Sequence, residues 1–208
     1  TQYQNHQVLI ANMEDPNDLD KKMHHLVLNH PIHILINNTG GPAAGQAHLA
    51  KVEEFELAFK QHLIANQIIT SHAIQGMKDA NYGRIINIIS TSVKQPIDNL
   101  GVSNTIRGAV ANWAKTLANE LAAFHITVNN ILPGATRTER LESIIQKEQL
   151  LHHKTQQEIE QLLLAAIPMK RFAEPEEIAN AVAFLASPLA AYITGINVPV
   201  DGGRTKSL

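Results

Sequence analysis

The sequence predicts an α/β domain built on a doubly wound, mostly parallel sheet with helices on both faces. Short runs rich in β-branched residues recur along the chain, and longer helical patterns separate them, as in repeated β-α-β units. The runs are also apolar nearly throughout, as expected of strands covered on both faces. The predicted strands are Val8–Met13, Ile32–Asn38, Arg84–Ser90, Ile126–Leu132 and Ile196–Val200.

Apolar stripes at helical spacing predict the helices between these strands. Leu19, Met23 and Leu26 form one stripe after a helix start at Asp15-Pro16. Residues 138 to 167 are polar, rich in Gln and prone to form helix, but they lack the continuous apolar face of a core helix, so we expect a mobile region over the site. The remaining stripes are Phe55-Phe59-Leu63, Ile106-Val110-Trp113-Leu117-Leu121 and Ile178-Val182-Leu185, the last preceded by Glu174-Pro175-Glu176-Glu177 and ended near Ser187-Pro188.

Length and composition indicate one domain over residues 1–208 and exclude some partners. A chain of this size buries roughly 70% of the surface that it exposes when unfolded. The 17 basic and 19 acidic residues give a net charge of -2, so no basic field favours nucleic acid. The apolar stretches are shorter than the ~20 residues of a membrane span, and Thr1–Gln7 is too polar for a secretory signal. The absence of cysteine suits a reducing compartment but equally suits a protein that happens to avoid the residue, so a cytoplasmic setting is the default expectation.

Five sequence segments, taken in order, resemble the short-chain dehydrogenase/reductase family. The resemblance covers residues 8 to 203 and implies a Rossmann-like αβα fold, NAD or NADP as cofactor, a small-molecule substrate and a homodimer or homotetramer. It also implies subunit packing through the helix with Val110, Trp113 and Leu117 and through Ile196–Val200. The segments are Asn37-Asn38-Thr39-Gly40-Gly41-Pro42, Gly83 to Ser90, Val128 to Gly134, Arg171 to Ala179 and Gly195 to Gly203.

Several polar and glycine residues follow predicted strands at one edge of the sheet, where open parallel sheets bind ligands. Glycine there lets backbone approach a ligand closely; the alternative is that these glycines merely end strands. The resemblance assigns cofactor binding to Asn12, Asn38, Thr39, Gly40, Pro133, Gly134 and Thr138.

The family's strand order is 3-2-1-4-5-6-7, and by resemblance Val8–Met13 corresponds to the third strand. Two strands should then lie between it and Ile32–Asn38, a gap of roughly 10 Å. We therefore expect the sequence to omit an N-terminal β-α-β portion; the alternative is a truncated protein in which Val8–Met13 pairs differently. The glycine-rich turn and the residue that chooses between NAD and NADP would lie in that portion, so cofactor preference cannot be read.

The catalytic positions depart from the family pattern of Ser, then Tyr, then Lys, with Asn on the preceding long helix. Alignment of residues 107 to 118 puts Ser103 at the Tyr position and Arg107 at the Lys position, with Ser90 thirteen residues before Ser103. Alignment through Met77 places His62 at the Asn position. The predicted catalytic residues are therefore His62, Ser90, Ser103 and Arg107.

These replacements change the proton chemistry. A serine hydroxyl is far less acidic than a phenol with a pKa near 10. Arg107 cannot shuttle protons but can grip cofactor ribose or a substrate carboxylate, and His62 can supply a proton. The tyrosines Tyr3, Tyr82 and Tyr192 lie outside the catalytic helix and do not fill the gap.

Each catalytic assignment has a structural alternative. Ser90 can simply end a strand, Ser103 and Arg107 can be a helix cap and a solvated side chain, and His62 can be a packing residue. The adjacent pairs His24-His25 and His152-His153 lack the spacing of a metal clamp, so we predict no metal.

Two functions remain open at this point. The first is NAD(P)-dependent oxidation or reduction of a secondary alcohol or carbonyl, with a general resemblance to 3-oxoacyl reductases. The second is a binding or scaffold protein that kept the fold after losing hydride chemistry. The motif at Asn38-Thr39-Gly40 favours the first, and the loss of Tyr and Lys favours the second.

Overall fold

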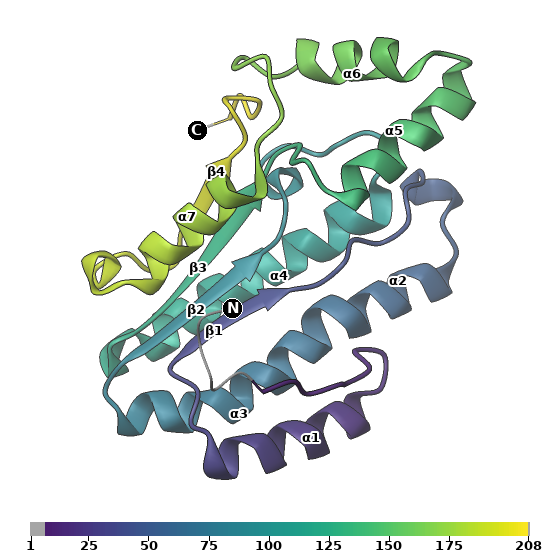
Figure 1. The fold of residues 1–208 in the computed structure, drawn as a ribbon. Coiled ribbons are helices and arrows are strands. Elements are labelled where there is room, and N and C mark those ends of the chain that lie inside the picture. The colour runs from purple at the N-terminus through teal and green to yellow at the C-terminus, as the bar shows by residue number, and fades with distance from the viewer. Residues whose placement is uncertain (1–6, 208) are drawn as a thin grey trace.

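A four-stranded parallel sheet forms the centre of the computed structural model, which describes residues 7–207. Its strands follow the sequence order β1-β2-β3-β4, and all neighbours pair in parallel. In Figure 1 the strand arrows accordingly point the same way, so their carboxyl ends share one edge. The α/β fold class is confirmed. The strands are β1 (Ile34–Asn38), β2 (Gly83–Ile88), β3 (Ile126–Pro133) and β4 (Asn197–Val200).

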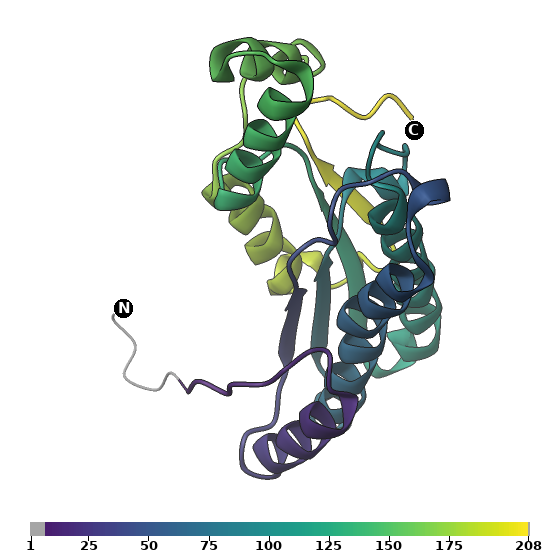
Figure 2. The ribbon, with the colours of Figure 1, turned by 90° about the vertical axis from the view of Figure 1, so that its right-hand side faces the viewer.

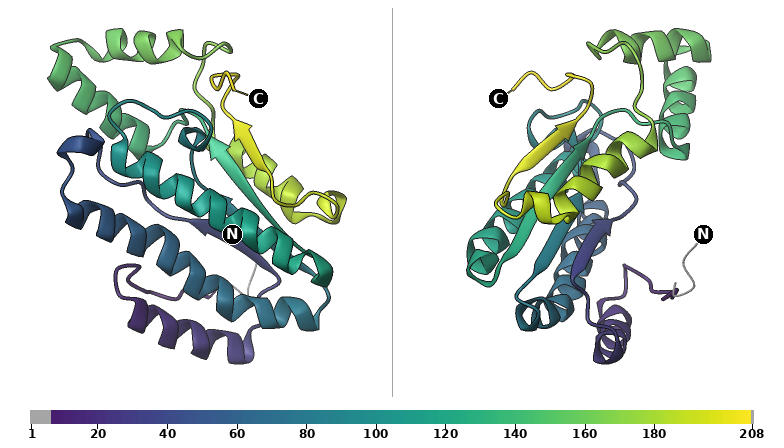
Figure 3. Two further views of the ribbon diagram at one scale, coloured as in Figure 1. Left: turned by 180° about the vertical axis from the view of Figure 1, so that it is seen from behind. Right: turned by 60° about the vertical axis from the view of Figure 1, so that its left-hand side comes forward.

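Helices cover both faces of this sheet. The long helices α3 (Ala65–Asp79) and α4 (Gly101–Leu121) lie on one face, and α7 (Pro175–Ala186) lies on the other, as Figures 2 and 3 show. On the first face Leu35, Ile85 and Val128 are buried against helix residues that include Met77 and Ala114. On the second face Ile86 and Ile131 pack against Leu185 of α7. Successive side chains of each strand point to opposite faces of the sheet, so the strands contribute to two separate hydrophobic cores.

Every predicted apolar stripe forms a helix. Asp15 caps α1, because its carboxylate accepts hydrogen bonds from the N–H groups of Asn17 and Asp18. Leu19 and Met23 of α1 pack against α3 rather than against the sheet. The other helices are α1 (Pro16–Asn29), α2 (Val52–Phe59), α5 (Glu139–His152) and α6 (Gln156–Ala165), the π-helical turn η2 (Lys60–Ile64), and the 3₁₀ turns η1 (Ala47–Leu49), η3 (Thr91–Val93), η4 (Ala122–Phe124) and η5 (Pro188–Ala190).

The predicted strand Val8–Met13 is wrong. These residues form no strand, and Val8 and Ile10 are 87% and 82% exposed. A strand needs a neighbour for its backbone N–H and C=O groups. In the family order that neighbour is a strand lying between this segment and β1, and the described residues contain none there. The segment therefore runs as an extended chain into the turn before α1.

β1 is consequently an edge strand that is covered on one face only. Leu35 points into the core under α3 and α4, but Ile34 and Ile36 remain 45% and 47% exposed. α7 covers β2, β3 and β4 and does not reach over β1, as Figure 1 shows.

Four asparagines form a hydrogen-bonded row across all the strands, on the face covered by α3 and α4. The amide of Asn37 donates to Asn87 at 2.8 Å, Asn87 donates to Asn130 at 2.9 Å, and Asn130 donates to Asn197 at 2.8 Å. The same residues are partners in the strand register. Because a register slip would leave these buried amides unpaired, the row fixes the alignment of the strands.

No helix in residues 7–207 combines the length and the apolar character that a membrane crossing requires. Thr1 to His6, which include Tyr3 and most of the polar segment considered as a signal, lie outside the described residues.

We expect Asn87→Leu to lower the free energy of unfolding by about 2 to 4 kcal/mol, because it leaves the amide N–H of Asn37 without its acceptor and the amide oxygen of Asn130 without its donor. Urea denaturation would measure the loss. The matched control Asn197→Leu, at the partly exposed end of the row, removes one hydrogen bond and should cost about 1 kcal/mol. Equal losses in the two variants would contradict the role given to the row.

Candidate active site

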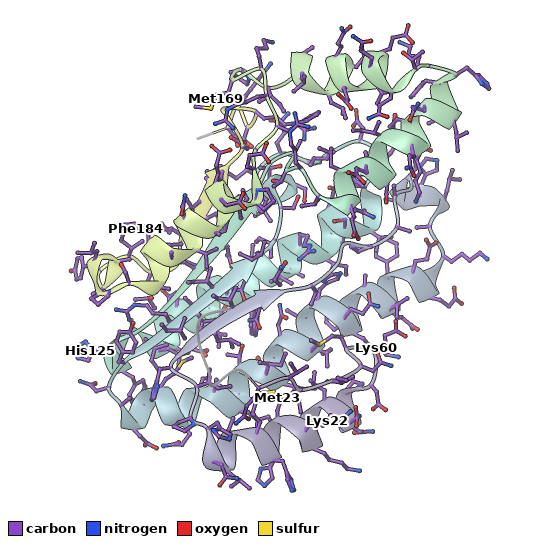
Figure 4. All side chains as sticks on the ribbon, in the orientation of Figure 1. Lys22, Met23, Lys60, His125, Met169 and Phe184 are labelled. Atoms are coloured by element: carbon purple, nitrogen blue, oxygen red, sulfur yellow. The ribbon has the colours of Figure 1, made fainter. Side chains whose placement is uncertain are left out.

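The carboxyl edge of the sheet brings three of the predicted segments together. The loop Thr39 to Pro42 follows β1, Ser90 follows β2, and Pro133 with Gly134 ends β3. The helices α5 and α6 rise beyond this edge (Figure 1), whereas His125, before β3, marks the opposite edge (Figure 4). Tyr82 also lies at that opposite edge, where its hydroxyl donates to the carbonyl of Ala186 at 3.0 Å.

Arg107 ties two strand ends together from α4. Its Nη1 donates to the carbonyl oxygen of Ile88 at 3.1 Å, and its Nη2 donates to that of Thr39 at 3.4 Å. The side chain is only 6% exposed. Burial, and then the nearby charge of Arg140, lower the pKa of Arg107 to about 10. The guanidinium therefore stays charged at neutral pH, and the alternative of a solvated arginine is wrong.

His62 lies fully buried in the π-helical turn η2, where it meets the loop after β1. Its Nδ1 forms a hydrogen bond with the hydroxyl of Thr39, and its Nε2 has no partner among the described residues. Burial, and then the charge of Arg107, lower the pKa of His62 to about 4. The imidazole is thus neutral near pH 7, and it does not hold a stored proton as an imidazolium.

The two predicted serines lie on the elements that Arg107 joins, Ser90 two residues after Ile88 and Ser103 one helical turn before Arg107. Ser90 is half-buried, and its hydroxyl accepts a hydrogen bond from the N–H of Ser92 at 3.1 Å, which starts the turn η3 against α4. Ser103 is buried on α4, and its spacing from Arg107 puts both on one helix face. Leu100, not Ser103, is the N-cap of α4, so the helix-cap alternative for Ser103 is wrong.

The predicted cofactor-binding residues divide into two groups. Asn38, Thr39 and Gly40 lie at the open edge, and a Cβ added to Gly40 would meet no heavy atom within 4 Å. Gly134 instead has a packing role, because a Cβ there would lie 2.7 Å from the Cα of Asp201.

The other predicted cofactor-binding residues lie in different settings. Pro133 is half-buried at the end of β3, and Thr138 precedes α5 with its hydroxyl donating to the carbonyl of Thr136 at 3.2 Å. Asn12 does not end a strand. Its side chain accepts from the N–H of Glu14 at 3.0 Å in the turn before α1, so it stands apart from the strand-end residues.

Arg140, in the first turn of α5, also reaches the loop after β1 and was not predicted from the sequence. Its Nη2 donates to the carbonyl oxygen of Pro42 at 2.8 Å, and its guanidinium lies 3.5 Å from the position of a Cβ on Gly41. Acidic residues are favoured in the first turn of a helix, whereas a cation there is unfavourable. An arginine at this position therefore indicates a role other than stabilising the helix.

The segment that carries Arg140 has a small core of its own. Leu141 and Ile145 of α5 pack with Ile159 of α6 and with Ile167 and Phe172. Each helix buries only these few side chains, as the polar sequence predicts, and most of α5 and α6 faces solvent above the sheet. Its mobility stays a prediction.

Comparison with known proteins decides the family. A sequence profile of the family described as Enoyl-(Acyl carrier protein) reductase matches residues 1–205. NADPH-dependent reductase BacG of Bacillus subtilis (strain 168) is 34% identical over 175 residues, which are 84% of this chain and 68% of BacG. The chain belongs to the short-chain dehydrogenase/reductase family.

Other family members resemble the chain to a similar degree. The 3-oxoacyl-[acyl-carrier-protein] reductase FabG of Rickettsia felis is 33% identical over 93% of this chain and 73% of that protein. The crystal structure of YwfH, an NADPH-dependent reductase involved in bacilysin biosynthesis, superposes with a TM-score of 0.89 at 32% identity. That match covers 96% of this chain and 78% of YwfH.

The buried neutral imidazole makes stability depend on pH. The unfolded chain protonates His62 below about pH 6.5, whereas the folded protein resists protonation until about pH 4. Lowering the pH through this window therefore favours unfolding, by up to about 1.4 kcal/mol per pH unit.

We expect His62→Gln to flatten the dependence of unfolding free energy on pH, measured by urea denaturation from pH 4.5 to 7.5. The control His48→Gln, at an exposed histidine, should keep the slope of the parent protein, and an unchanged slope in His62→Gln would refute the assignment.

Proposed function

We propose that this chain carries the substrate-binding and nicotinamide-facing part of an NAD(P)-dependent reductase that acts on a carbonyl or secondary alcohol. The observation that carries the proposal is the hydrogen-bonded set Arg107, Thr39 and His62 at the carboxyl edge of the sheet. Ser90 and Ser103 extend this set on the neighbouring strand end and helix. The reductase names of BacG, FabG and YwfH support the same reaction class, including the general likeness to 3-oxoacyl reductases.

The residues fit one part of a nicotinamide dinucleotide. Open space at Gly40 and the exposed Asn38 leave room for a flat group and a ribose beside the strand ends. The residues 7–207 supply no glycine-rich turn between a strand and a helix N-terminus, which is the arrangement that receives a pyrophosphate.

The chain's own residues can manage the charge and the proton of the reaction. NAD(P), when bound, supplies or accepts the hydride. Ser90 and Ser103 would donate hydrogen bonds to the substrate oxygen, and the fixed charge of Arg107 would stabilise negative charge that develops on it. The neutral ring of His62 would hold the Thr39 hydroxyl in place, because its Nε2 is buried without a partner among the described residues and the ring has no second atom there to which it could pass a proton. The proton that reaches the substrate oxygen would come from water through the hydroxyl of Ser90 or Ser103. Two serine hydroxyls and a non-titrating cation would thereby stand where the family pattern has Tyr and Lys.

Replacement of Arg107 tests this assignment. We expect Arg107→Ala to lower kcat/KM for a ketone by about 100-fold, since a preorganised charge at the reacting oxygen is worth about 3 kcal/mol, and Arg107→Lys to recover part of it. The measurement is NADPH absorbance in single turnovers with a panel of ketones. Asn112→Ala, on the exposed face of the same helix, is the control and should react at the parent rate.

The same assay separates the second function. A protein that binds NADPH fully and shows no change of absorbance with any ketone is a binding or scaffold protein, and the reductase proposal then fails. The loss of the family's Tyr and Lys is the sequence feature that favours that outcome.

We also propose a cytoplasmic homodimer or homotetramer packed through α4, by residues other than Val110 and Leu117, and through the region of Ile196–Val200. Val110 and Leu117 are buried inside the chain against β3 and its neighbours, so they are unable to form an interface. Trp113 is partly buried and donates to Gln67 at 2.8 Å. The region of β4 remains suitable, because Ile196 is 40% exposed beside this edge strand.

Light scattering tests the assembly. We expect a mass of at least two chains, and Ile196→Glu should shift it toward one chain, because a charge replaces apolar surface at the proposed contact. A monomeric parent protein would refute the proposal.

A further inference from the structure

Two arginines from different helices hold the same short loop. Arg107 of α4 donates to the carbonyl of Thr39, and Arg140 of α5 donates to the carbonyl of Pro42, three residues later. Between these two anchors lie Gly40 and Gly41, which present no side chains. The guanidinium of Arg140 lies over Gly41, and Gly40 borders open space. The two cations therefore converge at one loop of the candidate active site.

Neither cation has an acidic partner among the described residues. The ion pairs of residues 7–207 join Arg137 to Glu174 and Arg171 to Glu177, for example, and none includes Arg107 or Arg140. Arg107 is buried, and a buried charge ordinarily has a counter-charge because desolvation is costly. The charge of Arg140 adds repulsion, which contributes to the lowered pKa of Arg107. An anion between the two would relieve both costs.

The geometry points to a substrate that carries a carboxylate, held by Arg140 and by Arg107, whose guanidinium would also face the carbonyl oxygen beside Ser90 and Ser103. This inference rests on the proposed function and names the substrate class of that site. Each guanidinium has five N–H donors, and the backbone carbonyls take only two from Arg107 and one from Arg140. Enough donors remain for a forked grip on a carboxylate. The same chemistry would hold a cofactor phosphate, so the experiment includes an arm for each source.

The kinetic arm compares an acid with its neutral ester. With saturating NADPH, we expect the parent protein to reduce 3-oxobutanoate at least tenfold more efficiently than methyl 3-oxobutanoate, as kcat/KM. Arg140→Gln should lower the ratio of kcat/KM for the acid to that for the ester by about tenfold or more, chiefly through the KM of the acid, since one charge-assisted hydrogen bond to the acid is lost. Arg140→Lys, which keeps the charge, should recover part of the preference. Arg137→Gln removes an equal charge three residues away and should keep the acid preference.

The binding arm needs no turnover. Isothermal titration of the full chain with 3-oxobutanoate, without cofactor, should show binding that Arg140→Gln weakens about tenfold or more and Arg137→Gln leaves intact. Circular dichroism and the melting temperature confirm that the variants fold, as expected for the exposed Arg140.

The outcomes separate the two proposals. Failure to reduce any ketone, with the titration behaving as expected, overturns the reductase and leaves the carboxylate site standing. Reduction of acid and ester at equal efficiency overturns the carboxylate site and leaves the reductase standing. A tenfold weaker affinity of Arg140→Gln for NADP⁺, with an unchanged ratio of acid to ester, assigns the two arginines to the cofactor phosphate and also overturns the inference.

Discussion

The hold of Arg107 on two strand ends is the interaction on which the rest of the site depends. Its guanidinium bridges the carbonyl of Ile88, at the end of β2, and that of Thr39, just after β1. These two bonds set the position of Thr39, and through its hydroxyl that of His62. A lysine, with a compact ammonium, would not span the same acceptors in a planar fork. In this chain the residue that carries the positive charge is therefore also part of the framework.

The row of hydrogen-bonded asparagines across the four strands is a second polar constraint on the structure. The row from Asn37 to Asn197 pairs amides inside a face that is otherwise apolar, and every link follows the strand register. Apolar side chains tolerate small changes in strand register, but paired amides do not, because each change would leave several buried donors and acceptors without partners. The alignment of the strand ends, and with it the spacing of the site, is thus fixed from inside the sheet.

Local patterns predicted most of the fold. The apolar stripes predicted α1, α4 and α7, and capping signals predicted the starts of α1 and α7, because capping and helical periodicity are properties of neighbouring residues. Val8–Met13 has an equally good strand pattern and forms none, since a strand depends on a partner that its own residues do not encode. The apolar reading of the strands also missed the asparagine row, which exists only once four strands stand in register.

Only those residues of the candidate site that follow from spacing along the family's alignment could be predicted. The frame from Ser90 through Ser103 to Arg107 follows from sequence alone, and Arg107 and Ser103 are indeed buried together on α4. The π-helical turn that buries His62 leaves no mark in a stripe analysis, and the lowered pKa of its ring is a property of burial. Arg140 belongs to a different helix and reaches the site only through tertiary structure.

The loop that accepts hydrogen bonds from Arg107 and Arg140 follows β1, an edge strand that is covered on one face only. β1 uses its backbone hydrogen bonds on one side only, and one of its faces is open to water. Local opening of a protein starts where such support is thinnest. Fraying of β1 would displace Thr39 and weaken the hydrogen bonds from both arginines at once. Local opening at this edge of the sheet would therefore also disrupt the candidate active site. A bound anion, by holding the two arginines, would in turn slow amide hydrogen exchange along β1.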